Sequence, residues 1–213
     1  MPTAALRPAR PLAILALGAA AFDLAVFLVL HATQPGVDVL RDPTSNYVHG
    51  TLGFLSPLAA AAVGIGGLCL AVACWRVVSG AAARIGAILL ALFGLAKLAQ
   101  AFFPIDAAGQ ATASGAAHNL LGNLAFFVLP VAAVLLTGAV ARATGHGRPV
   151  WRPAAVYGLL VGLTVLVLAG DALGWFGVAQ RLYLVGAAGW AALIALWLLM
   201  PPQARTATAG DRK

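Results

Sequence analysis

Residues 12–32 read LAILALGAAAFDLAVFLVLHA, an apolar run. Its only acidic or basic residues are Asp23 in the middle and His31 next to its end. A helix needs about 20 such residues to cross the hydrocarbon core of a bilayer. Arg7 and Arg10 precede the run, as basic residues do in secretory signal peptides. The run is nevertheless longer than the core of a signal peptide and contains a carboxylate. It therefore predicts a transmembrane helix that the protein retains.

The same composition continues along the chain. Of its 213 residues, 62% are hydrophobic and 9% are charged, whereas soluble domains carry about 25% charged residues. Because lipid offers the backbone no hydrogen bonds, each apolar run must be helical. Six runs approach spanning length, at residues 12–32, 50–74, 83–103, 118–142, 154–175 and 180–200. We predict an all-α integral membrane protein, a single domain over residues 1–213 with short tails at 1–11 and 201–213.

The basic residues predict how these helices are oriented. One side of the predicted bundle carries ten of them, namely Arg7, Arg10, Arg76, Arg84, Arg142, Arg148, Arg152, Arg205, Arg212 and Lys213. The other side carries only Arg41 and Arg181. Since Lys and Arg are retained in cytoplasmic loops, we expect both termini in the cytoplasm and the protein in a bacterial-type plasma (inner) membrane. The basic residues are not interleaved with aromatic ones, so the net charge of +7 does not indicate binding to nucleic acid.

Two charged residues lie inside predicted spans. Asp23 is in the first run and Lys97 is in the third, and both fall between the midplane and the outer third of the bilayer when counted along a helix. Charge at this depth is costly and indicates a functional site. Opposite charges at one depth predict an intramembrane charge pair. The pair would be either a structural salt bridge or a gate or proton relay, and Gln100 would extend its polar face.

A second group of polar residues gathers at the predicted outer face. Its members are Ser45, Tyr47, His49, Asp106, His118, Asn119, Asp171 and Arg181. Four of the six acidic residues lie at this face, whereas Asp211 is the only acidic residue predicted on the cytoplasmic side. We therefore expect an outward-facing polar pocket built from these side chains.

Several chemistries compete for this pocket. His49, Asp106 and His118 could hold a divalent metal with an open position, as catalytic zinc sites do. Ser45 and His49 resemble the Ser-x-x-x-His of the alkaline ceramidase and adiponectin-receptor superfamily, but the late His-x-x-x-His of that superfamily is missing. His49 and His118 could instead ligate a haem, which nothing else in the sequence supports. The remaining interpretations are a site for a lipid headgroup or small solute, and a set of interfacial residues in which Thr44 or Ser45 caps the second helix.

A short internal similarity links two of the runs. Residues 49–55 and 118–124 both read H-x-x-L-G-x-L. Both would open helices that run from the outer to the inner face, so the fold could consist of three related helical hairpins.

The chain resembles a known family at several of these positions. The resembling pieces are Ser45-Asn-Tyr47, Phe103-Pro-Ile-Asp106, residues 112–118 (TASGAAH) and residues 177–181 (GVAQR). They are similar to the bacterial and archaeal membrane proteins of domain of unknown function family 998. The resemblance covers residues 12–200 and implies a six-helix membrane fold without implying a biochemical role. The family pattern has an acid where Gln180 stands, so a carboxylate partner for Arg181 is missing at that position.

Taken together, these features predict a multi-pass membrane protein whose outward-facing pocket binds a lipid or small molecule. One alternative is a membrane-embedded metal-dependent hydrolase that uses His49, Asp106 and His118. Another is a small transporter or accessory subunit that uses Asp23 and Lys97. The sequence contains no Walker loop, H-E-x-x-H or G-x-S-x-G motif that would assign a reaction.

Overall fold

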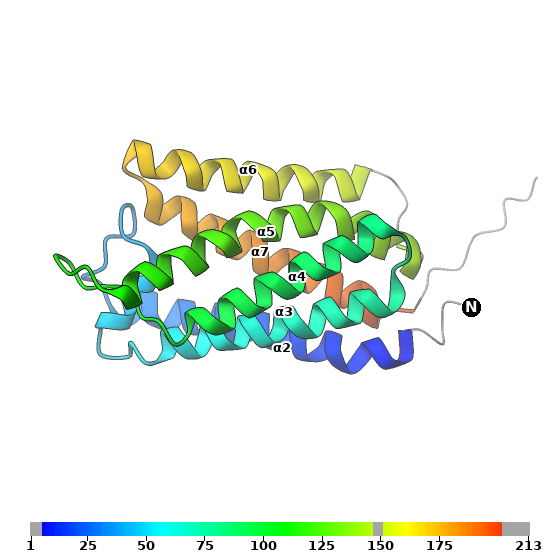
Figure 1. Ribbon diagram of the computed structural model, residues 1–213, viewed down its shortest axis with the longest axis horizontal. Coiled ribbons are helices and arrows are strands. Elements are labelled where there is room, and N and C mark those ends of the chain that lie inside the picture. The colour runs from blue at the N-terminus through cyan, green and yellow to red at the C-terminus, as the bar shows by residue number, and fades with distance from the viewer. Residues whose placement is uncertain (1–5, 147–150, 202–213) are drawn as a thin grey trace, which may run out of the picture.

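A computed structural model of the chain describes residues 6–146 and 151–201, with the side chains of 151–159 outside the description. This part of the chain is helical and contains no strand. Six long helices run along one axis (Figure 1): α2 Arg10–Thr33, α3 Leu55–Val77, α4 Ala81–Gln100, α5 Ala113–Thr144, α6 Trp151–Leu173 and α7 Phe176–Leu199. Two short 3₁₀ helices, η1 Arg7–Ala9 and η2 Thr44–His49, complete the described elements.

Five segments are long and apolar enough to cross a membrane: Arg7–Thr33, Leu55–Val77, Ala81–Gln100, Ala113–Thr144 and Phe176–Leu199. In α6 the apolar stretch with described side chains, Leu160–Leu173, is shorter than a span. The all-helical, multi-pass character predicted from hydropathy is therefore confirmed. The sixth crossing stays a prediction.

Several helix ends differ from the predicted boundaries, and three of them bear on the candidate site. Helix α3 begins at Leu55 instead of residue 50, because the chain turns through Gly50 and Gly53 first. A Cβ atom on Gly53 would overlap the carbonyl of Val48, so this tight turn requires glycine. Helix α4 ends at Gln100 instead of 103. Helix α5 begins at Ala113 instead of 118.

The early start of α5 has a local cause. The Thr112 hydroxyl accepts a hydrogen bond of 3.1 Å from the backbone N–H of Gly115. This is an N-cap contact, which satisfies one of the unpaired amide groups at a helix start.

Because of these helix boundaries, the two H-x-x-L-G-x-L segments have different positions relative to the helices that follow them. His49 is the last residue of η2 and the residues after it form turns, whereas His118 lies within the regular helix α5. The matching residues therefore have different local structures in the two segments, and the similarity does not extend to backbone conformation.

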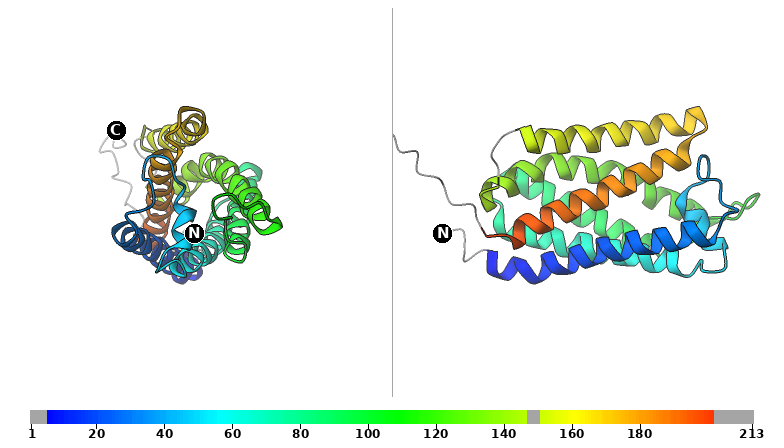
Figure 2. Two further views of the ribbon diagram at one scale, coloured as in Figure 1. Left: turned by 90° about the vertical axis from the view of Figure 1, so that its left-hand side faces the viewer. Right: turned by 180° about the vertical axis from the view of Figure 1, so that it is seen from behind.

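The helices form a ring with one member outside it. Viewed along the bundle (Figure 2), α2, α3, α4, α5 and α7 follow one another around a central space, and α6 packs against the outside of α5 and α7. Helices α3 and α4 approach each other closely. A Cβ atom on Gly64 would lie 2.6 Å from the backbone nitrogen of Leu98. Small residues allow such close packing of helices in lipid.

The two ends of the bundle have different structures. Helix α2 begins and α7 ends at the same end (Figure 1). The opposite end holds the long connection between α2 and α3, which contains η2, and the connection between α4 and α5. That second end corresponds to the face predicted to be outside, so it would carry any outward-facing site.

Candidate ligand-binding cavity

A cavity of about 440 Å³ occupies the centre of the helix ring. Residues of α2, η2, α3, α4, α5 and α7 line it, and among the described side chains α6 contributes none. Its volume lies within the range of roughly 300–1,000 Å³ that is typical of small-molecule sites. The lining on α2 extends from Ala16 to Leu30, which is roughly 20 Å along a helix axis. The cavity is therefore elongated along the bundle.

The deep part of the cavity is apolar. It is lined by small residues that leave the space open and by a few large side chains, among them Ala16, Ala20, Gly66, Leu70, Leu90, Leu129, Ala188 and Trp190. Trp190 is held in place because its indole N–H donates a hydrogen bond of 2.9 Å to the hydroxyl of Thr137. An apolar side chain or ligand tail is the chemistry that fits such walls.

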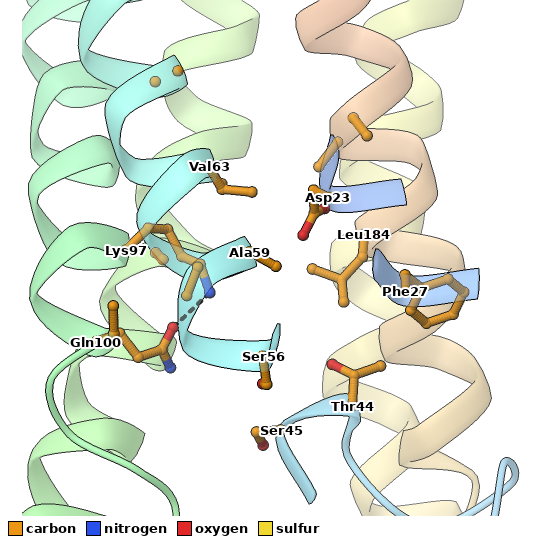
Figure 3. A pocket seen from close by; sticks show the side chains of 18 of the residues that line it. Asp23, Phe27, Thr44, Ser45, Ser56, Ala59, Val63, Lys97, Gln100 and Leu184 are labelled. Atoms are coloured by element: carbon orange, nitrogen blue, oxygen red, sulfur yellow. Dashed lines mark hydrogen bonds between the residues drawn. The ribbon is translucent and has the colours of Figure 1, made fainter. Parts of the chain in front are cut away.

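The outer part of the cavity carries polar and charged groups. Lys97 projects from α4 and Asp23 from α2, and the two face each other across the space (Figure 3). The Lys97 ammonium donates to the side-chain oxygen of Gln100 at 2.5 Å. The Gln100 amide in turn donates to the backbone carbonyl of His118 at 3.1 Å. The expected polar face of Lys97 and Gln100 is therefore present.

Asp23 and Lys97 line one cavity without forming a salt bridge. In residues 6–146 and 151–201 the single salt bridge joins Arg41 to Asp38 at the surface. The Asp23 carboxylate also accepts no hydrogen bond from the described residues. The structure therefore brings the two charges to the same chamber but leaves space between them.

The connection between α2 and α3 covers the polar end, and Arg181 fastens it to α7. Arg181 is only 6% exposed. One terminal nitrogen donates to the carbonyls of Val39 at 3.1 Å, Asp42 at 2.8 Å and Gly177 at 2.9 Å. Its other terminal nitrogen donates to the Tyr47 hydroxyl at 3.0 Å. Carbonyl oxygens thus take the place of a carboxylate partner for this guanidinium.

Gln180 and Tyr47 make further contacts with this connection. The Gln180 side-chain oxygen accepts hydrogen bonds from the Thr44 amide at 2.7 Å and the Thr44 hydroxyl at 3.1 Å. The Tyr47 hydroxyl pairs with Nδ1 of His31 at 2.9 Å. The expectation that Thr44 or Ser45 caps the second helix is wrong, because α3 begins at Leu55 with Phe54 at its N-cap position, whereas Thr44 and Ser45 belong to η2.

The predicted outer group divides into two sets. Ser45, Tyr47 and His118 line the cavity. The lining does not include His49, Asp106, Asn119, Asp171 or Arg181. His49, Asn119 and Asp171 are exposed, and no hydrogen bond or salt bridge joins Asp171 to Arg181 in the described chain.

Asp106 and His118 serve local structure at the start of α5. The Asp106 carboxylate accepts hydrogen bonds from the hydroxyl of Thr112 at 2.6 Å and from its amide at 3.0 Å. These bonds hold the pKa of Asp106 below its ordinary value because they stabilise the charged carboxylate. The bond from the Thr112 hydroxyl has the largest effect. Nδ1 of His118 bonds to the carbonyl of Phe103 at 2.7 Å.

The described residues do not form the ligand sets that the metal and haem interpretations require. In the part of the chain that the structure describes, no three His, Cys, Asp or Glu side chains are grouped so as to hold a metal ion. His49 is exposed and is not among the residues that line the cavity, whereas His118 contributes to the lining. The two histidines therefore do not share the chamber in which a haem could lie.

Sequence reasoning missed several residues of the cavity. Ser56 lines it from the first turn of α3, and Gln180 lines it from α7. Gln180 could have been predicted to take part in the site, because a buried glutamine at the start of an apolar helix needs a hydrogen-bond partner. Ser56 carried none, since a serine at a helix start is ordinary.

The fold and cavity define a multi-pass helical membrane protein with an internal chamber. The chain belongs to the family described as protein of unknown function (DUF998), whose family model matches residues 16–197. The match includes every residue that lines the cavity, from Ala16 to Ala191. No curated protein and no solved structure matches the chain.

Proposed function

We propose that the protein binds a lipid-like amphiphile in the central cavity. The apolar tail would occupy the deep part of the chamber, and the polar headgroup would lie beside Asp23 and Lys97. The observation that carries this proposal is a single elongated cavity with an apolar depth and a charged outer part. This distribution matches an amphiphile in both chemistry and direction.

The cavity dimensions favour a molecule with one chain. A volume of about 440 Å³ lies in the lower half of the range for ligand sites, which suits a single apolar tail better than two. The ten basic residues that the sequence predicts on one side of the membrane, against two on the other, support a plasma-membrane protein with cytoplasmic termini. In that orientation the charged part of the chamber lies in the outer half of the membrane.

The alternatives have less support. A metal-dependent hydrolase needs a ligand set, and the described residues do not assemble one. A transporter or accessory subunit could use the same chamber, but no described feature distinguishes transport from binding. Amphiphile binding is the function that the shape and lining support directly.

Quenching of Trp190 tests the proposal, because this residue lines the cavity. The protein would be placed in nanodiscs and titrated with a monoacyl lipid whose chain carries bromine. We expect saturable quenching that exceeds the quenching of the Trp190→Phe variant, in which only the other four tryptophans respond.

Neighbouring alanines of α2 provide a matched pair of variants. Ala20 lines the cavity, whereas Ala21 is exposed and lies outside the lining. Ala20→Phe should fill the chamber and abolish the Trp190-dependent quenching, and Ala21→Phe should leave it unchanged. Equal quenching in both variants would contradict the proposal.

A further inference from the structure

The two charges that face the cavity have incomplete hydrogen bonding. The Lys97 ammonium has three donor hydrogens and donates to one described acceptor, Gln100. The Asp23 carboxylate accepts no hydrogen bond from the described residues. Both groups point into the chamber from opposite walls (Figure 3). A polar occupant between them would complete the bonding of both.

We propose that the cavity selects a zwitterionic headgroup, whose anion lies on Lys97 and whose ammonium lies on Asp23. This inference rests on the proposed binding of an amphiphile and adds the chemical class of its head. It assigns each charged residue a separate role, in place of a pair in which the two residues neutralise each other.

Electrostatics distinguishes this class from singly charged headgroups. An anionic head would gain from Lys97 but would bring a like charge to Asp23, and a cationic head would have the reverse problem. Like charges inside a low-dielectric chamber repel strongly. A zwitterion places an opposite charge beside each residue and carries no net charge into the membrane interior. Desolvation of each ion is then offset by a partner.

Neighbouring polar groups support the two positions. Gln100 holds the Lys97 side chain and is itself fixed by the backbone carbonyl of His118. Ser45 and Ser56 line the outer part of the same chamber (Figure 3). Their hydroxyls can donate to the remaining oxygen atoms of an anionic group. The site therefore offers donors around Lys97 in addition to its charge.

The test compares three headgroups on one brominated chain, again through quenching of Trp190. The probes are lysophosphatidylethanolamine, lysophosphatidic acid and an alkyl trimethylammonium, which are zwitterionic, anionic and cationic. We expect the wild-type protein to bind the zwitterion about tenfold more tightly than either other probe, since a hydrogen bond to a charged group is typically worth at least that factor. Equal affinity for all three would overturn the inference and leave amphiphile binding intact.

Two neutral variants of similar size give the sharper result. Asp23→Asn should shift the preference to the anionic probe, because repulsion at that wall is removed. Lys97→Gln should shift it to the cationic probe. A purely structural role for the two charges would change the affinity for all three probes by the same factor, and that outcome would overturn the inference.

The remaining outcomes separate the two proposals. If no probe quenches Trp190 above the Trp190→Phe background, amphiphile binding itself fails. Free phosphoethanolamine serves as a competitor without a chain. Displacement only by millimolar phosphoethanolamine would uphold both proposals, because the tail then provides most of the affinity. Displacement at the concentration of the lipid probe would uphold the headgroup assignment and overturn the role of the tail.

Discussion

Arg181 shows how one side chain can hold two distant parts of this protein together. It lies on α7, yet three of its hydrogen bonds reach Val39, Asp42 and Tyr47 in the connection between α2 and α3. Guanidinium suits this position because its planar fork carries several donors with fixed geometry. A lysine has a single ammonium and could not reach the same set of acceptors.

We predict that Arg181→Met destabilises the protein by about 2–4 kcal/mol, because buried acceptors that lose a donor each cost about 1–3 kcal/mol. Arg181→Lys should recover only part of this loss. Chemical unfolding in maltoside micelles would measure the free energy of unfolding. Arg41→Gln is the control, since that side chain is 73% exposed and its loss should change the stability by less than about 0.5 kcal/mol. A similar small effect for Arg181→Met would show that the contacts do not hold the connection.

At the scale of elements, the connection between α2 and α3 acts as a cover on the outer part of the chamber. Four of its residues line the cavity at the outer end: Thr44, Ser45, Tyr47 and Val48. Gln180 and Arg181 bind this connection to α7 through hydrogen bonds. Gly177 allows this close approach. A Cβ atom there would lie 2.6 Å from the carbonyl oxygens of both Val39 and Asp42.

We predict that Gly177→Ala displaces the connection and leaves the helix bundle intact. Hydrogen exchange followed by mass spectrometry should show faster exchange in residues 38–48, with little change in α3 and α4. Gly189→Ala is a matched control on the same helix, because a Cβ atom at Gly189 has no neighbour within 4 Å. Both changes add one methyl group to the same helix, and the added group meets backbone oxygens only at position 177. Unchanged exchange in Gly177→Ala would mean that the cover tolerates the added methyl group.

At the scale of the whole molecule, orientation in the membrane decides which solution the chamber faces. The two faces predicted from the sequence differ strongly in basic residues, ten against two. This bias predicts that the connection between α3 and α4 is cytoplasmic and that the connection between α4 and α5 is outside.

Single cysteines would test this orientation in a background without Cys69 and Cys74. Ala108→Cys and Ser79→Cys are suitable positions, because both residues are exposed in connections at opposite ends of α4. An impermeant thiol reagent added to intact cells should label position 108, and position 79 should react only after the membrane is opened. The reverse pattern would invert the bundle and move the charged part of the chamber to the inner half of the membrane.

The sequence by itself determined the helical, multi-pass fold and the place of its polar residues along each helix. Hydropathy is a local property, and lipid leaves an apolar segment no alternative to a helix. The contact between Lys97 and Gln100 was also foreseeable, since residues three apart share a helix face. Local turn chemistry was harder to foresee: Gly50 and Gly53 leave His49 before α3, and Thr112 starts α5 ahead of His118.

Only the tertiary structure decided which polar residues meet. Counting residues along helices places Asp23 and Lys97 at similar depth, but the rotation and spacing of the helices decide whether they bond or face each other across a cavity. Arg181 likewise finds three of its four acceptors more than 130 residues earlier in the chain. No local pattern records such contacts. The chamber itself arises where five helices pack as a ring and α2, α3, α5 and α7 contribute small residues to its lining, and a ring of neighbours is a property of the packed bundle alone.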